Sequence, residues 1–240
     1  MKKLLLAIFA FIFVACSDSN SEKVYKFGIS PDYPPFDSVV DGKITGFDAE
    51  LLENLAKIAG FKYEFVAMSF DGLIAGLKAG KIDAIISAMS ASEQRKKACD
   101  FSNVYYKART IYIKHKDSPY EHKDELKDKK VGVQLGTVQE AAVKELGAIV
   151  SPNETPTVLV LALNEKKLEA LALDALVARE FLAKNEDLVE FFSEEDGTEG
   201  FSIAFDKGKN ADLKDKLNKA LEEFSKTPEY EELLKKYNII

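Results

Sequence analysis

The stretch FDGLIAGLKAGKIDAIISAMSASEQR, residues 70–95, combines a helix, a buried strand and a loop rich in hydroxyl groups. Residues 70–80 favour a short helix that ends at Gly80, and residues 81–87 favour a strand with three consecutive apolar residues. The chain then changes to small and hydroxyl residues and reaches a single arginine, Arg95. This pattern predicts a loop that holds a small anion. The alternative is an ordinary strand, turn and capped helix.

The same alternation of strands and helices extends on both sides of this stretch. Residues 24–30 (VYKFGIS) and 62–68 (KYEFVAM) favour strands, and residues 46–60 (GFDAELLENLAKIAG) favour an amphipathic helix. Such a β–α–β–α–β series predicts a mainly parallel sheet flanked by helices. A second series begins at residues 129–137 (KKVGVQLGT), with a strand, a Gly136–Thr137 turn and a helix. We therefore expect two α/β lobes.

The sequence predicts some of the remaining elements clearly and leaves others open. Residues 156–184 are rich in alanine and leucine, so helix propensity dominates, and a strand near residues 171–174 is left open. Residues 200–208 favour a strand. The C-terminal region favours two amphipathic helices that are interrupted at Pro228.

Composition limits the class of protein. The 240 residues are 46% hydrophobic and 30% charged, with a formal net charge of −7, which disfavours nucleic acid as a partner. Apart from Cys16, the only cysteine is Cys99, so an internal disulfide is not expected after N-terminal processing. Cys99 is interpreted as a small core residue.

The N-terminus differs from the rest of the chain. Lys2 and Lys3 precede twelve apolar residues, 4–15, which is shorter than the ~20 that span a bilayer but fits a secretory signal. The following Cys16, in FVAC, resembles a bacterial lipoprotein processing box. We expect a signal peptide over residues 1–15 and a lipidated tether over residues 16–23, outside the cytoplasm. The alternative is an unlipidated signal peptide with a nearby cut.

Several loops that follow predicted strands are expected to converge. Ligands of open α/β sheets bind beyond the carboxyl ends of the strands, where residues 30–36, 68–70, 87–95 and 136–139 would lie. Tyr33, Phe36 and Phe70 would supply aromatic walls.

Ser90 is predicted to cap a helix, with Glu93 completing a capping box. Arg95, near that helix start, would then face an anion together with free N–H groups.

The order of these motifs resembles the extracytoplasmic amino-acid-binding proteins of ABC importers, and most closely their lysine/arginine/ornithine- and glutamine-binding types. The resemblance rests on residues 31–36 and 46–60, on residues 70–106, on residues 129–140 and on residues 217–224. It implies a type II periplasmic-binding-protein fold of two α/β lobes joined by two hinge strands. Residues 24–111 plus 202–240 would form one lobe, and residues 112–201 the other.

The resemblance also implies ligand contacts. Arg95 would pair with the α-carboxylate, aided by the N–H of Ser90, and the turn of Thr137 and Val138 would donate from the second lobe. The α-ammonium would meet a carbonyl of Ala88 or Ser87 and the carboxylate of Asp174.

The ligand side chain would lie between Tyr33 and Phe70, with Gln139 at its distal end. Lysine/arginine binders often carry an acidic residue three positions before this tyrosine, where the present chain has Ser30. Asp32 lies nearby but is expected to point elsewhere. The predicted order of ligands is arginine or lysine first, then glutamine or another polar neutral amino acid.

The sequence favours a receptor that delivers its ligand to a membrane-embedded ABC permease, and two other functions are alternatives to it. The first is an enzyme on the same scaffold, such as a dehydratase or lyase of a small carboxylate, which requires a general acid or base. His115 and His122 are expected to be solvated, and no metal-ligand spacing or phosphate-binding glycine loop is present, so we expect no metal or cofactor. The second is a sensory or adhesive surface module. The receptor is expected to be a monomer, held to the membrane only by its lipid.

Overall fold

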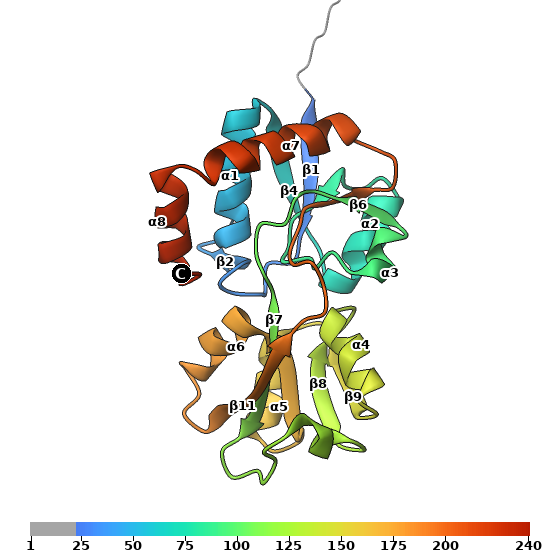
Figure 1. Cartoon of the computed structure of the whole chain (residues 1–240), viewed down its shortest axis with the longest axis vertical. Helices are drawn as coiled ribbons and strands as arrows, with labels where there is room; N and C mark the ends of the chain where they lie inside the picture. The colour runs from blue at the N-terminus through green and yellow to red at the C-terminus, as the bar shows by residue number, and fades with distance from the viewer. Residues whose placement is uncertain (1–22) are drawn as a thin grey trace, which may run out of the picture.

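The computed structural model describes residues 23–240, which form two lobes linked by two chain segments (Figure 1). The predicted signal peptide and Cys16 therefore lie outside the described residues. Each lobe is built on one five-stranded sheet, in agreement with the expected two-lobed α/β fold. Within residues 23–240, no helix has the length and apolar character needed to cross a membrane.

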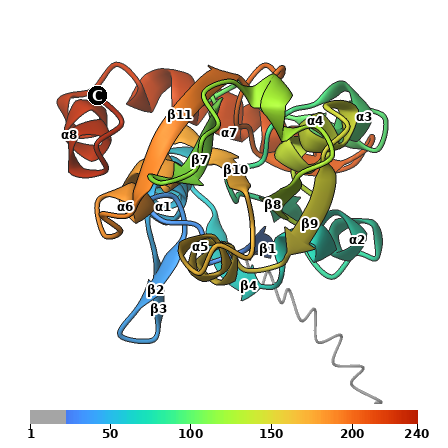
Figure 2. The same ribbon diagram turned by 90° about the horizontal axis from the view of Figure 1, so that it is seen from below.

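The first lobe has strand order β4-β1-β5-β12-β6. Its strands are β1 (Val24–Ile29), β4 (Lys62–Ala67), β5 (Ala84–Ile85), β6 (Cys99–Phe101) and β12 (Ala204–Asp206). Its helices are α1 (Phe47–Ala59), η1 (Phe70–Gly72), α2 (Leu73–Lys78), α3 (Glu93–Lys96), α7 (Ala211–Phe224) and α8 (Pro228–Lys236). A small hairpin, β2 (Ser38–Val40) and β3 (Lys43–Thr45), projects from this lobe (Figure 2).

The second lobe has strand order β11-β7-β10-β8-β9. Its strands are β7 (Arg109–His115), β8 (Lys130–Gln134), β9 (Ile149–Asn153), β10 (Ala170–Asp174) and β11 (Leu188–Glu195). Its helices are η2 (Lys123–Leu126), α4 (Val138–Glu145), α5 (Pro156–Asn164) and α6 (Ala175–Leu182). β10 is central although its sequence, ALALD, is rich in helix formers. All five of its residues are buried, so burial between two neighbouring strands outweighs local propensity.

Each sheet is mainly parallel, with one reversed strand. β12 runs antiparallel to both β5 and β6, and β7 runs antiparallel to both β10 and β11. These are the first strands that the chain forms after it crosses between the lobes. A chain that enters a lobe from the cleft starts at the edge where the parallel strands end, so its first strand must run the opposite way. The cleft therefore lies at the carboxyl ends of both parallel sets.

The two crossing segments pair with each other between the lobes. The N–H of Phe201 donates to the carbonyl of Tyr106 at 2.9 Å. Gly200, with φ of 123°, permits this approach, because a Cβ there would lie 2.2 Å from the carbonyl oxygen of Tyr106. This backbone pairing ties the two crossings together at the hinge.

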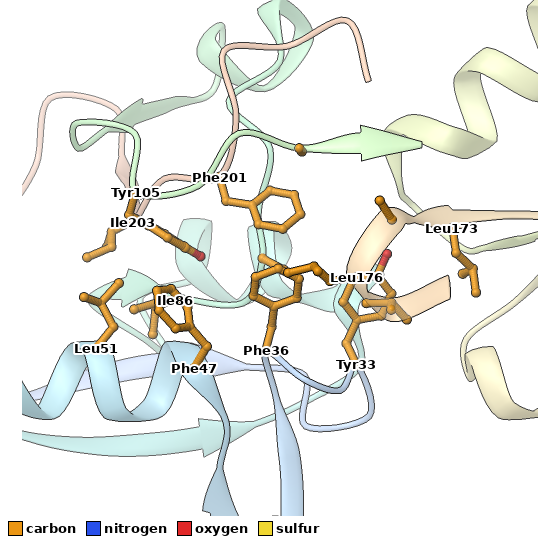
Figure 3. Close-up of a cluster of buried hydrophobic side chains, with 14 of the residues drawn as sticks. Tyr33, Phe36, Phe47, Leu51, Ile86, Tyr105, Leu173, Leu176, Phe201 and Ile203 are labelled. Carbon is orange, nitrogen blue, oxygen red and sulfur yellow. The ribbon is translucent and has the colours of Figure 1, made fainter. Parts of the chain in front are cut away.

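Apolar packing continues from the first lobe into the hinge and the second lobe. Figure 3 shows Phe36 directed toward Phe201 of the returning crossing, with ring centroids 5.1 Å apart. Tyr33, from the same loop, lies on the side of Leu173 and Leu176 of the second lobe, and all three belong to one buried cluster. Phe36 is thus a core residue and not a wall of the cleft. Cys99 is also fully buried, as expected.

Candidate ligand-binding site

A narrow cavity lies between the lobes at the carboxyl ends of the strands. Its lining includes eight of the expected residues: Tyr33, Phe70, Ala88, Ser90, Arg95, Thr137, Val138 and Gln139. The free volume is about 10 Å³, close to the ~10–15 Å³ that one water needs by this measure. The lobes are thus closed on each other, and they must separate to admit a larger molecule.

Arg95 joins the two walls of this cavity. Its Nη1 donates to the carbonyl of Ser90 at 2.9 Å, and its Nη2 donates to the carbonyl of Gly136, in the other lobe, also at 2.9 Å. The guanidinium carbon lies 5.2 Å from the centre of the Phe70 ring, within the range of a cation–π contact.

The charge of Arg95 is not neutralised locally. Burial lowers the pKa of this side chain to about 10, so it remains protonated at neutral pH. Among the residues that the structure describes, no carboxylate lies within ion-pair distance of it, and its partners are neutral carbonyls. A buried cation in such surroundings is stabilised by an incoming anion.

Ser90 does not cap the helix, contrary to expectation. The N-cap of α3 is Ser92, whose Oγ accepts a hydrogen bond from the N–H of Arg95 at 3.3 Å. Ser90 instead forms a β-bridge with Phe201, a contact from the distant crossing segment that draws it into extended backbone. Its hydroxyl donates to Oδ2 of Asp196 at 2.9 Å. The serine therefore remains at the cavity, held by the hinge.

Asp174 stands at the end of β10, in the second lobe. It is fully buried, and its Oδ1 caps α6 by accepting from the N–H of Leu176 at 3.0 Å. Its Oδ2 is buried without a hydrogen-bond partner in the described chain. Burial raises the pKa of this carboxyl to about 7. Asp174 therefore caps α6 with one oxygen, and its other, free oxygen is suited to a cationic donor.

Tyr33 brings Asp174 close to the cavity. The N–H of Asp174 donates to the hydroxyl oxygen of Tyr33 at 3.2 Å, which is a second bond between the lobes. Asp174 itself does not line the closed cavity, and neither do Ser30 and Ser87. The N–H of Ser30 donates to Oγ of Ser87 at 2.9 Å, so these two serines support the loops behind the cavity wall.

The second lobe contributes the start of α4. Gly136 has φ of 78°, and Thr137 caps the helix through its Oγ1, which accepts from the N–H of Glu140 at 3.3 Å. Such a helix start presents unpaired N–H groups, here those of Val138 and Gln139, and partial positive charge. Nε2 of Gln139 donates to Oγ1 of Thr110 at 3.2 Å, which fixes this buried side chain against β7.

Sequence reasoning missed three residues of this site. Gln134 and Phe201 line the cavity, and Asp196 binds Ser90 from the returning crossing. Gln134 ends β8, so its position just before the Gly136 turn was a usable signal. Asp196 lies in the turn-rich segment EEDGTEG, and nothing local to it indicates a partner more than one hundred residues away.

One expectation about a polar group was wrong. His115 is the last residue of β7 and is buried, with its Nδ1 accepting from the N–H of Asp117 at 3.2 Å. Asp32 lies beside Ser30, and its Oδ1 accepts from the Ser30 hydroxyl at 3.0 Å, but neither residue lines the closed cavity. Within residues 23–240, no group of three or more His, Cys, Asp or Glu is arranged to hold a metal ion.

The site and fold define a two-lobed ligand-binding protein, and comparison with known proteins agrees. The sequence profile of the bacterial extracellular solute-binding proteins, family 3, matches residues 25–239, and the chain belongs to this family. The resemblance deduced from its motifs is thus confirmed. The protein is a binding protein of the extracytoplasmic space and not an enzyme.

Individual relatives are similar over nearly their whole length. A probable histidine-binding protein from Campylobacter jejuni is 43% identical over 94% of this chain and 89% of that protein. The arginine-binding extracellular protein ArtP from Bacillus subtilis is 38% identical over 99% of this chain and 98% of that protein. The arginine-, lysine-, histidine-binding protein ArtJ from Geobacillus stearothermophilus is 32% identical, with a TM-score of 0.81 over 90% of this chain and 95% of that structure.

Proposed function

We propose that the protein binds a free amino acid between its lobes and delivers it to the permease of an ABC importer. Arginine or lysine is the preferred ligand, followed by glutamine or another polar neutral amino acid. The observation that carries this proposal is a pair of buried, uncompensated charges on opposite lobes, namely Arg95 and the free oxygen of Asp174. An α-amino acid carries the two complementary charges at one end.

The roles follow from the chemistry of each group. Arg95 exchanges its carbonyl partners for the α-carboxylate, which its planar fork binds through two parallel hydrogen bonds. The N–H groups of Ser90 and Val138 add donors from both lobes, and Thr137, whose hydroxyl donates to the carbonyl of Gln134 at 2.7 Å, holds the turn that presents Val138. Asp174 accepts from the α-ammonium, together with a carbonyl of Ala88 or Ser87.

The side chain of the ligand would extend between Tyr33 and Phe70. Asp32 follows Ser30 in the loop that carries Tyr33, and its pKa is raised, chiefly by burial and further by the charge of Glu154 in the second lobe, although its bond to Ser30 opposes the shift. A cationic side chain placed near these two carboxylates would relieve their repulsion. The names of the relatives, which bind histidine, arginine or lysine, favour the same class.

Closure about the hinge couples binding to transport. The closed cavity is too small for an amino acid, so the ligand enters an open form and stabilises a closed form by contacts to both lobes. The hinge would lie in residues 107–112 and 200–204. We further propose that Cys16 is lipidated, which would hold a monomer at the outer face of the membrane. A Cys16→Ser variant that still incorporates labelled fatty acid would contradict the anchor.

A thermal-shift screen of the twenty amino acids tests the ligand class. A ligand at 100 times its Kd adds about 2.7 kcal/mol to the free energy of unfolding, so arginine or lysine should raise the melting temperature clearly. Citrulline, which has the shape of arginine without its charge, is the matched control. If no amino acid shifts the melting temperature, the receptor proposal fails. If citrulline matches arginine, the cationic preference fails and the receptor proposal stands.

A further inference from the structure

Two aspartates lie side by side beneath the cavity and take no part in the proposed ligand contacts. Asp37 follows the proline-rich loop of residues 31–35, and Asp48 is in the first turn of α1. Both are fully buried. The N–H of Asp48 donates to the carbonyl of Phe36 at 3.1 Å, which places the two residues on adjacent backbone.

Each carboxylate uses one oxygen to hold the same short piece of chain, Ser87 and Ala88. The Ser87 hydroxyl donates to Oδ2 of Asp37 at 2.8 Å. The N–H of Ala88 donates to Oδ2 of Asp48 at 2.6 Å, and the Tyr105 hydroxyl donates to the same atom at 3.0 Å. Ala88 has φ of 44°, a left-handed conformation that alanine rarely adopts, so these bonds maintain an unfavourable backbone geometry.

The second oxygen of each aspartate is the unusual feature. Oδ1 of Asp37 and Oδ1 of Asp48 are both buried and have no hydrogen-bond partner among the described residues. The ionisable groups that act on the pair are Tyr105, from the first crossing segment, and Asp32, from the proline-rich loop. No lysine, arginine or histidine in the described chain forms an ion pair with either aspartate. Two buried negative charges without a cation are strongly unfavourable.

One proton resolves both problems. A proton on one aspartate removes one of the two charges and supplies an O–H donor, which the neighbouring carboxylate with its unpartnered oxygen can accept. Asp48 accepts two hydrogen bonds, which favours its ionised form, and Asp37 accepts one. Burial, followed by the charge of Asp48, raises the pKa of Asp37 well above its usual value, which supports Asp37 as the acid.

We propose that Asp37 and Asp48 share one proton at neutral pH, and that this acid–carboxylate pair is a positioning element that fixes Ser87 and Ala88 for ligand binding. The positioning role rests on the proposed function, because Ala88 lines the cavity. The shared proton does not, and it can be measured without ligand.

The proton is tested by the pH dependence of unfolding. A group protonated in the folded protein and ionised in the unfolded chain makes the unfolding constant rise tenfold for each pH unit. Between pH 7.5 and 8.5, the unfolding constant of wild type should therefore rise more steeply with pH, by up to one proton, than that of Asp37→Asn, whose amide donates the same hydrogen bond without titrating. Asp41→Asn, at an exposed aspartate of the β2–β3 turn, is the matched control and should retain the wild-type slope. Equal slopes for wild type and Asp37→Asn would overturn the proposal.

Carboxyl ¹³C NMR of aspartate-labelled wild type keeps the test valid if Asp37→Asn does not fold. One buried carboxyl should have the chemical shift of a protonated acid at pH 7.5, and two ionised shifts would overturn the shared proton.

The positioning role is tested by ligand binding. Asp37→Ala should weaken amino-acid binding more than tenfold, whereas Asp37→Asn should bind within about threefold of wild type. If alanine and asparagine are equivalent in a protein that still binds an amino acid, the positioning role is refuted.

Discussion

Replacing Arg95 by methionine should abolish ligand binding while leaving the protein folded. The ligand carboxylate would enter a closed site without its cationic partner, and a buried charge left unpaired costs roughly 3–5 kcal/mol. Since each ~1.4 kcal/mol is a factor of ten in Kd, the affinity for arginine should fall by roughly 10²–10⁴-fold.

The same substitution should change stability only slightly. Burial lowers the pKa of Arg95 to about 10, which shows that the surroundings disfavour its charge, and methionine removes that charge while filling much of the volume. Of the two carbonyls that lose a donor, that of Ser90 still accepts from the N–H of Ser92 at 2.9 Å. The melting temperature should therefore remain within a few degrees of wild type.

Isothermal titration calorimetry with arginine, combined with thermal unfolding, separates these two effects. Arg95→Lys keeps the charge but loses the planar fork, so its affinity should lie between those of wild type and Arg95→Met. A folded Arg95→Met protein that binds within tenfold of wild type would refute the carboxylate role of Arg95. A methionine variant that unfolds would instead show that Arg95 is needed for structure.

Three further predictions concern the site and the core. Burial raises the pKa of Asp174 to about 7, and the ligand ammonium pairs with the ionised form of this side chain. The affinity should therefore fall by up to tenfold per pH unit as the pH is lowered from 7 to 5. Asp174→Asn should remove this pH dependence in calorimetric titrations. Gly136→Ala should lower stability by ~1–2 kcal/mol through its left-handed alanine, and it should also weaken binding several-fold, because its Cβ would lie 3.1 Å from Cα of Asp71 across the cleft and hinder closure. Gly147→Ala, with the same φ of 78° but nothing closer than 3.7 Å, should lose stability without loss of affinity. Phe36→Ala should lower the free energy of unfolding by ~3–5 kcal/mol in urea titrations, because its fully buried ring packs against Phe47, Tyr106 and Phe201.

The parts of the fold that could be predicted are those encoded within one element and its turns. The apolar run at residues 84–86 followed by hydroxyl residues located β5 and the cavity loop, and Gly60 located the end of α1 through its left-handed conformation. Candidate residues were found wherever a polar or aromatic group directly follows a strand. The convergence of the loops after β1, β4, β5 and β8 then follows from the parallel sheets alone.

The parts that could not be predicted depend on contacts distant in sequence. Both Ser90 and Ser92 are plausible caps, and the pattern Ser90–Glu93 is the better capping box by local rules. The bridge from Ser90 to Phe201 decides the outcome, and it joins positions 111 residues apart. The sequence left the strand β10 open for the same reason. Its position between β7 and β8 is determined by pairing in the sheet and not by the local sequence ALALD.

The closed lobes also explain why affinity should depend on groups that the ligand displaces. The lobes are joined by the bond from Arg95 to the Gly136 carbonyl and by the bond from the N–H of Asp174 to the Tyr33 hydroxyl. Arg95 cannot direct the same N–H groups to Gly136 and to a carboxylate, so the ligand must replace this contact with a stronger, charge-assisted one. Only the difference between the two contributes to affinity. A neutral carbonyl is a weaker partner for a guanidinium than a carboxylate is, so the exchange leaves most of the electrostatic gain for the amino acid.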